Sequence, residues 1–218
     1  MSMSGSLTQD TIQGPPPPPI DRGWGGGGSG SGGGEGRGAD RRASFTALFV
    51  LLAASTMVFA AFTSAFVVRK GLSDDWVSMP KPPILLVNTL VLLASSFALD
   101  LSRRALKAGN RSRFNLWWSA GTGLGVLFLA GQAVAWHQLL QAGVFVATNP
   151  SSSFFYVLTA SHAFHLVGGL AALVYVDIQA WRLQLGPAKR TTIDIAALFW
   201  HFLDGLWVYL MILFYVWG

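Results

Sequence analysis

His162, His165, His201 and Asp204 lie within otherwise apolar stretches in the C-terminal third of this 218-residue chain. His201 and Asp204 are three residues apart, and His162 and His165 have the same spacing, so each pair lies on one face of a helix. Ionisable groups are costly in hydrocarbon, which makes them functional-site candidates by default. Such groups could ligate a metal or a haem iron, or they could form hydrogen bonds between helices.

The ligand set is incomplete for a metal site. Two histidines on one helix face cannot be the opposite axial ligands of one iron, so a haem would need a ligand from another helix, such as His201. A single-metal site needs more ligands than these histidines and Asp204 supply, and the chain has no cysteine. We therefore predict hydrogen bonding between helices and no metal in this chain. Haem ligation, as in a free-standing b-type cytochrome, is kept as an alternative.

The composition is that of a membrane protein. Apolar residues make up 52% of the chain and charged residues 11%, whereas soluble domains have about 25% charged residues. Five apolar stretches reach or nearly reach the ~20 residues that cross a hydrocarbon core. They cover residues 43–68, 83–101, 114–141, 154–181 and 195–217. The predicted fold class is all-α, a polytopic membrane protein with a bundle of five transmembrane helices.

Residues 1–42 differ from the rest of the chain. Pro15 to Pro19 is an unbroken proline run, and Gly23 to Gly38 consists almost entirely of glycine and serine. Neither segment can bury enough apolar surface to offset the loss of chain entropy. We expect a disordered cytoplasmic tail, followed by a transmembrane domain over residues 43–218.

The formal charge of +5 indicates orientation and predicts no nucleic-acid partner. If the N-terminus is cytoplasmic, all but three of the 15 Lys and Arg residues lie on the inner side, the exceptions being Arg69, Lys70 and Lys81. This bias predicts a cytoplasmic N-terminus and a periplasmic or outer C-terminus. The Pro- and Gly-rich extension favours a bacterial inner membrane over a mitochondrial one.

Small and polar residues within the predicted helices indicate close helix contacts. Asn88 and Ser95 are seven residues apart, so they share a face that we expect to point at a neighbouring helix. Gly121, Gly123 and Gly125 allow a neighbouring backbone to approach closely.

Four motifs, in order along the chain, carry a resemblance to a known family. They are LVNTLVLLASS (86–96), NPSSSFFYVLTASH (149–162), HAFHLVGG (162–169) and WHFLDGLWVYLMILFYVWG (200–218). The last resembles the pattern W-H-F-x-D-x-x-W…Y-x-W-G of subunit III of the haem-copper terminal oxidases. The resemblance that the four motifs carry extends over all of the chain except the N-terminal tail. The chain resembles the five-helix form of that subunit.

The resemblance implies a subunit without a redox centre, which docks on catalytic subunit I, where haem and copper are held, in a complex with subunit II. It further implies bound phospholipid between the helices, support of proton uptake and protection of the catalytic subunit during turnover. The complex would reduce oxygen with electrons from cytochrome c and pump protons. The equivalent subunit of a quinol oxidase or a nitric-oxide reductase is the alternative. Expected at a subunit or lipid interface, and not catalytic, are Asn88, His162, His165, Trp200, His201, Asp204 and Trp207.

Two positions depart from the family pattern. Ser55 and Ala135 stand where the family often has glutamates, in the first and third spans. A glutamate left without its partner would be costly, so we interpret the paired loss as a sign that the two carboxyl groups bond to one another in relatives that have both.

Overall fold

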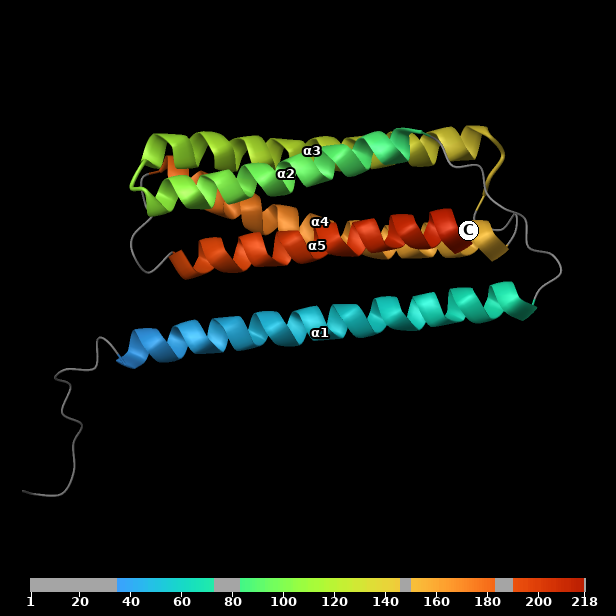
Figure 1. Ribbon diagram of the computed structural model, residues 1–218, viewed down its shortest axis with the longest axis horizontal. Helices are drawn as coiled ribbons and strands as arrows, with labels where there is room; N and C mark the ends of the chain where they lie inside the picture. The colour runs from blue at the N-terminus through green and yellow to red at the C-terminus, as the bar shows by residue number, and fades with distance from the viewer. Residues whose placement is uncertain (1–34, 73–82, 146–149, 183–189, 218) are drawn as a thin grey trace, which may run out of the picture.

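The computed structural model describes residues 35–72, 83–145, 150–182 and 190–217. Within these ranges the chain forms five long helices that lie side by side (Figure 1). Each is long and apolar enough to cross a membrane, which confirms the predicted fold class. The tail predicted to be disordered lies outside the described residues as far as residue 34. The helices are α1 (Glu35–Leu72), α2 (Ile84–Lys107), α3 (Arg111–Gln141), α4 (Pro150–Trp181) and α5 (Arg190–Trp217).

The helices extend beyond the apolar stretches that predict them. α1 begins at Glu35 rather than at residue 43, so residues 35–42, which we assigned to the tail, are helical. A helix that the apolar stretch has already formed adds further turns at little cost, because nucleation is the unfavourable step. α2 likewise continues past residue 101 to Lys107, and α5 begins at Arg190 rather than at residue 195. Long basic side chains can keep their charges in water beyond the apolar slab.

α2 and α3 form the most extensively packed helix pair. Their short connection contains Gly109, at φ 75°, and Asn110, whose side chain accepts a hydrogen bond from the amide of Arg113. Between the helices, the Ser95 hydroxyl donates to the carbonyl of Gly121 at 2.8 Å. Such close approach is possible because Gly121 has no side chain there. The expectation that Ser95 points at a neighbouring helix is confirmed.

The remaining helices extend this pair. α4 packs on α3 and α5, and α5 also packs on α2. α1 runs along the outside of this group and packs on α4 and α5 (Figure 1). Aromatic rings make these outer contacts: Phe66 of α1 meets Phe154 of α4 at a centroid distance of 5.7 Å and Phe214 of α5 at 6.3 Å.

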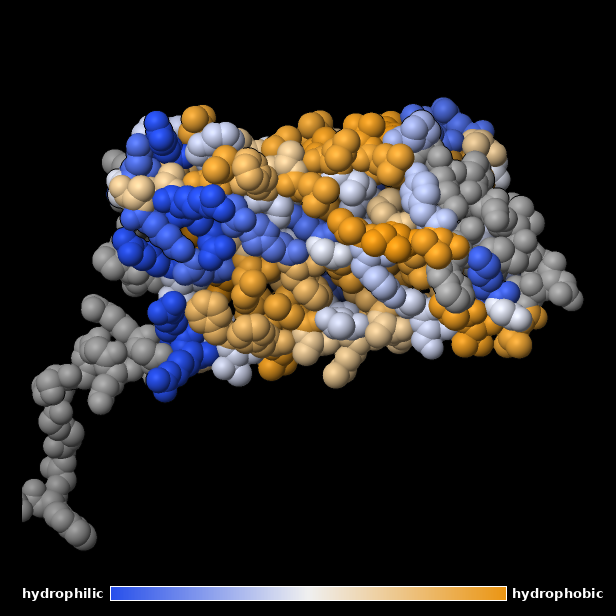
Figure 2. All heavy atoms as spheres, in the orientation of Figure 1, coloured by the Kyte–Doolittle hydropathy of each residue, from blue (hydrophilic) through white to orange (hydrophobic). Residues whose placement is uncertain are grey.

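Basic residues gather at one end of the bundle, which we call the basic end. It holds the first turns of α3 and α5 and the last turns of α2 and α4, while Arg69 and Lys70 lie at the opposite end of α1. Figure 2 shows hydrophilic residues gathered at this end and hydrophobic residues along much of the middle. The described residues of the basic end are Arg41, Arg42, Arg103, Arg104, Lys107, Arg111, Arg113, Arg182 and Arg190.

Candidate functional site

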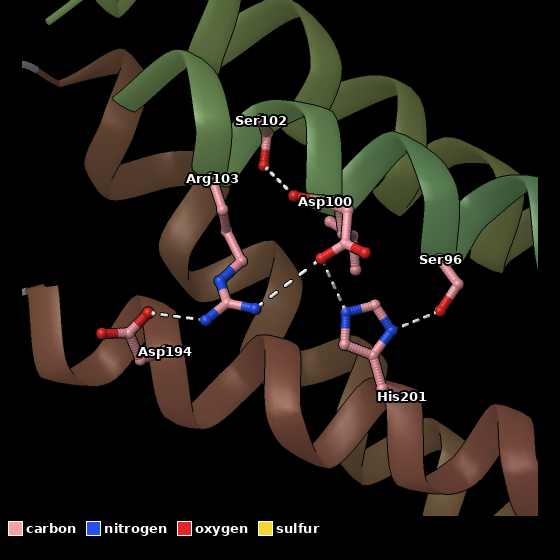
Figure 3. A network of polar contacts seen from close by, with 7 residues as sticks. Ser96, Asp100, Ser102, Arg103, Asp194 and His201 are labelled. Carbon is pink, nitrogen blue, oxygen red and sulfur yellow. Dashed lines mark hydrogen bonds and ion pairs between the residues drawn. The ribbon is translucent and has the colours of Figure 1, made fainter. Parts of the chain in front are cut away.

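Five polar side chains form a connected network between α2 and α5 (Figure 3). His201 Nδ1 is hydrogen-bonded to the Ser96 hydroxyl, and His201 Nε2 lies 3.4 Å from Asp100 Oδ1. Arg103 Nη1 lies 3.7 Å from the same Asp100 oxygen, while Arg103 Nη2 donates to Asp194 Oδ1 at 3.1 Å. We call these five residues the α2–α5 network. It joins two helices that are about 100 positions apart in the sequence.

Helical spacing places the members of this network. Ser96, Asp100 and Arg103 follow one another at intervals of four and three residues on α2, and Asp194 and His201 are seven apart on α5. Sequence analysis selected only His201 from this set and treated Arg103 as an orientation signal. Asp100 lies four residues after Ser96 and Asp194 seven residues before His201, so each pair could be placed on one helix face from the sequence. Spacing along a single helix does not reveal that α2 and α5 are neighbours.

Asp204 lies inside the bundle, beside Ser96 of the network. It is 4% exposed, and it does not pair with His201 although the two residues are three apart on α5. The Ser96 side chain lies beside the Asp204 carboxyl group. Among the described residues, neither carboxylate oxygen has a hydrogen-bond partner. Burying an ionisable group without a bonded partner is unfavourable, so Asp204 does not contribute to the stability of this chain through a hydrogen bond.

His162 and Trp207 are in contact in the centre of the bundle. Their ring centroids are 5.1 Å apart with an interplanar angle of 32°, and Phe128 of α3 lies edge-on to both rings. The Trp207 indole donates to the Thr89 hydroxyl of α2 at 3.0 Å. His162 is 1% exposed, and neither of its ring nitrogens has a hydrogen-bond partner among the described residues.

Asn88 and Trp200 are each pressed against a glycine of α3. A Cβ added at Gly131 would come within 2.1 Å of Asn88 Oδ1, and one at Gly125 within 2.7 Å of Trp200 Cη2. Asn88, like Ser95, thus faces α3, as the shared helix face predicted. Both side chains are buried, so their contacts are made within this chain.

His165 lies at the boundary between α4 and α1. Its Nδ1 is 2.8 Å from the carbonyl oxygen of Ser161, and its ring faces Phe59 of α1 with centroids 5.6 Å apart. The residue is partly exposed. His165 therefore helps to hold α1 on α4, at a position that a neighbouring molecule can still reach.

Residues 44–218, which include all but the first turns of α1 and the whole of α2 to α5, match the sequence model described as "Cytochrome c oxidase subunit III". The chain belongs to the cytochrome c oxidase subunit III family. The resemblance carried by the four sequence motifs is thereby confirmed.

Curated relatives of the same description cover most of the chain. Cytochrome c oxidase subunit 3 of Synechocystis sp. is 30% identical over 175 residues, covering 77% of this chain and 72% of the relative. The probable subunit 3 of Nocardia farcinica is 30% identical over 165 residues, covering 73% and 80%. Subunit 3 of Thermostichus vulcanus is 28% identical over 179 residues, covering 78% and 85%. These relatives are named as subunits of an oxidoreductase complex.

His162, His165 and His201 each contact a different neighbour. His162 stacks on Trp207, His165 faces Phe59, and His201 turns towards α2. Within the described ranges, no three His, Asp or Glu side chains gather in a group that could hold a metal ion. The alternative of a free-standing b-type cytochrome receives no support from these contacts.

Two of the seven predicted interface residues have surface available to a neighbour. His165 and His201 are partly exposed, while the other five are buried within this chain. The role predicted for the set at a subunit or lipid interface stays a prediction. For the buried residues, any influence on a neighbour is transmitted through the packing of α2, α3, α4 and α5. The buried residues are Asn88, His162, Trp200, Asp204 and Trp207.

Ser55 and Ala135 are not neighbours in this member of the family. Phe59, four residues after Ser55, packs on His165, whereas Trp136, next to Ala135, packs on Tyr156. α1 and α4 are antiparallel, so Ser55 and Ala135 differ in height along the bundle by roughly 20 Å at 1.5 Å per residue. α1 and α3 are not among the extensively packed helix pairs, so the contacts described give no support to a direct bond between carboxyl groups at these positions, and the interpretation stays a prediction.

Proposed function

We propose that this chain is the accessory subunit III of a haem-copper cytochrome c oxidase in aerobic respiration. It docks on catalytic subunit I, in a complex with subunit II, and those partners hold the haem and copper. The observation that supports this proposal is the family match over residues 44–218. The arrangement of the histidines agrees with it, because their rings are engaged in packing and hydrogen bonding within the bundle.

The proposed role is to stabilise the catalytic subunit and to support its proton uptake, with phospholipid bound between the helices. Large apolar side chains cover the outward face of α1, including Phe49, Leu51 and Met57, which are 58%, 48% and 71% exposed. In a membrane such a face requires lipid tails or another subunit. The extensive contacts of α1 are with α4 and α5. We therefore expect α1 to be the helix that borders bound lipid.

We place the subunit in the inner membrane of a bacterium, with its N-terminus in the cytoplasm and its C-terminus outside. The basic end supports this orientation, because Lys and Arg near helix ends are concentrated on the cytoplasmic side of membrane proteins. Reporter fusions at the two termini test it. A cytoplasmic reporter should be active at the N-terminus and inactive at the C-terminus, and the reverse pattern would contradict the orientation.

Purification in mild detergent tests the proposed function. A tagged chain should bring along a large haem- and copper-containing subunit, with cytochrome c oxidase activity in the same fraction. Recovery of the chain alone would count against the proposal. A visible spectrum of the chain separated from its partners provides a second readout. We expect no Soret band, and a Soret band of stoichiometric intensity would favour a cytochrome instead.

Deletion of the chain tests the protective role. An oxidase that lacks it should start at a similar turnover rate and lose activity after fewer turnovers than the complete complex. Loss of all oxygen reduction from the first turnover, with subunits I and II present and fully loaded, would contradict an accessory role.

A further inference from the structure

The α2–α5 network is polar and partly exposed, and it runs from the basic end into the transmembrane part of the chain. Ser96 lies eleven residues before Lys107, and His201 lies eleven residues after Arg190, which are the last and first residues of α2 and α5. At 1.5 Å per residue, both are roughly 16 Å from the basic end. Ser96 and His201 lie five to six residues inside the apolar stretches that end at residue 101 and begin at residue 195, whereas Arg103 and Asp194 lie just outside those stretches.

The network is open on its outer side. The side chains of Asp100 and Asp194 are 48% and 37% exposed, and that of His201 is 28% exposed. Figure 2 shows a hydrophilic strip that runs from the basic end towards the middle of the molecule between α2 and α5, with hydrophobic residues on both sides. Exposure of such groups to lipid tails costs several kcal/mol, so this strip requires a cover with polar atoms of its own.

A phospholipid headgroup does not suit the strip. Headgroups lie at the membrane surface, near the level of Arg103 and Asp194, whereas the His201–Ser96 hydrogen bond lies further in along both helices. The charge also disfavours a phosphate, because the network has two carboxylates and a single guanidinium, and both carboxylates already share that guanidinium. A side chain that donates hydrogen bonds or carries a positive charge would complement the strip.

We propose that the α2–α5 network is the surface through which this chain docks on a neighbouring oxidase subunit. The occupant is a transmembrane helix that carries a basic or amide side chain at the depth of Asp100 and His201. This inference rests on the proposed function, since it takes the oxidase complex as given, and it specifies which face of the bundle the complex covers. α1 and the outer side of α4 then remain for lipid.

Site-specific photo-crosslinking in the assembled oxidase tests which face is covered. Phe97 flanks the network on α2 and is 63% exposed, and Phe164 on α4 is 79% exposed and serves as the control. A photoreactive phenylalanine analogue at position 97 should give a protein adduct with another oxidase subunit, at a yield at least about fivefold above that at position 164. The adduct should map to a hydrophobic segment that contains a Lys, Arg, His, Asn or Gln.

Two outcomes of the crosslinking would overturn the inference while leaving the proposed function intact. One is a complex that retains the chain and the catalytic subunit but gives only lipid adducts or no adduct at position 97. The other is an adduct at position 97 in a segment without any basic or amide side chain. Failure of the proposed function looks different, because the catalytic subunit is then absent from the purified material altogether.

Neutral variants test the charge complementarity. The double variant Asp100→Asn, Asp194→Asn should lower the amount of this chain retained per haem at least about fivefold, because the partner's donor side chain loses charged acceptors. The matched control is Asp177→Asn on α4, whose side chain accepts from Ser119 at 2.6 Å and keeps an acceptor oxygen as asparagine. Retention should change less than about twofold for the control. Equal retention of the double variant and the wild type, at equal membrane levels of the chain, would contradict the proposed partner chemistry.

Discussion

The indole nitrogen of Trp207 on α5 donates a hydrogen bond to the Thr89 hydroxyl on α2, with the two atoms 3.0 Å apart. The same indole ring lies 5.1 Å from the rings of Phe128 on α3 and His162 on α4, measured between centroids. Trp207 thus contacts three other helices at one level of the bundle. Because the ring is buried, Thr89 is the group that satisfies its N–H.

Thr89→Val should destabilise the chain while preserving its shape. The substitution leaves the buried Trp207 N–H without an acceptor, and hydrogen bonds between membrane helices contribute up to about 1–2 kcal/mol. We expect the free energy of unfolding in mixed micelles to fall by about that amount. Thr56→Val is the control, because Thr56 is exposed and bonds only to the Leu52 carbonyl of its own helix. Equal effects of the two substitutions would show that the bond to Trp207 is not a stabilising contact.

Some helix contacts in this bundle follow from spacing along one helix. Ser95 and Asn88 face α3 because they lie seven residues apart on the face of α2 that packs against it, and that face could be predicted from their positions alone. The identity of the neighbouring helix could not, since spacing within a helix does not specify what lies opposite. The same limit explains why Ser55 and Ala135 were interpreted as partners, although their heights in the bundle differ.

The α2–α5 network escaped sequence analysis for a related reason. Asp100 is the second-last residue of the apolar stretch 83–101 and Arg103 lies just beyond it, so both read as hydrated residues at a helix end, and Asp194 directly precedes the apolar stretch 195–217. In the structure both helices continue beyond those stretches, to Lys107 and from Arg190. This extension brings the three charged side chains alongside one another, where they connect to His201. His201 and Asp204, in contrast, were recognisable as polar residues within an apolar run.

Gly125→Ala should destabilise the contact between α3 and α5. The added Cβ would lie 2.7 Å from the rigid Trp200 ring, which is fully buried and cannot move aside without disturbing the core. Overpacking of this kind costs about 1–3 kcal/mol. At Gly123, two residues earlier, an added Cβ meets nothing within 4 Å. Gly123→Ala should therefore leave the free energy of unfolding unchanged or raise it slightly, and a loss of equal size at both positions would contradict the packing described for Trp200.

Asp204→Asn should separate stability from function. Neither carboxylate oxygen has a hydrogen-bond partner among the described residues, so a neutral amide should leave the free energy of unfolding unchanged or raise it. If Asp204 serves the oxidase, the same variant should shorten the working life of the complex during turnover. Asp177→Leu provides the contrast, since it removes the acceptor of the Ser119 hydroxyl and should cost about 1–2 kcal/mol. A large loss of stability in Asp204→Asn would mean that the carboxylate has a structural partner.

Glutamates introduced at Ser55 and Ala135 should act independently. Both positions are buried, at 2% and 0% exposure, so each single variant should lower the free energy of unfolding by several kcal/mol. Their separation along the bundle, roughly 20 Å by helix rise, exceeds the distance within which substitutions couple, about 7–10 Å. The double variant Ser55→Glu, Ala135→Glu should therefore show the sum of the two losses within about 0.5 kcal/mol. A double variant more stable than that sum by over 1 kcal/mol would mean that the two carboxyl groups meet, and that α1 sits at a different height on α4 from the one fixed by Phe59 and His165.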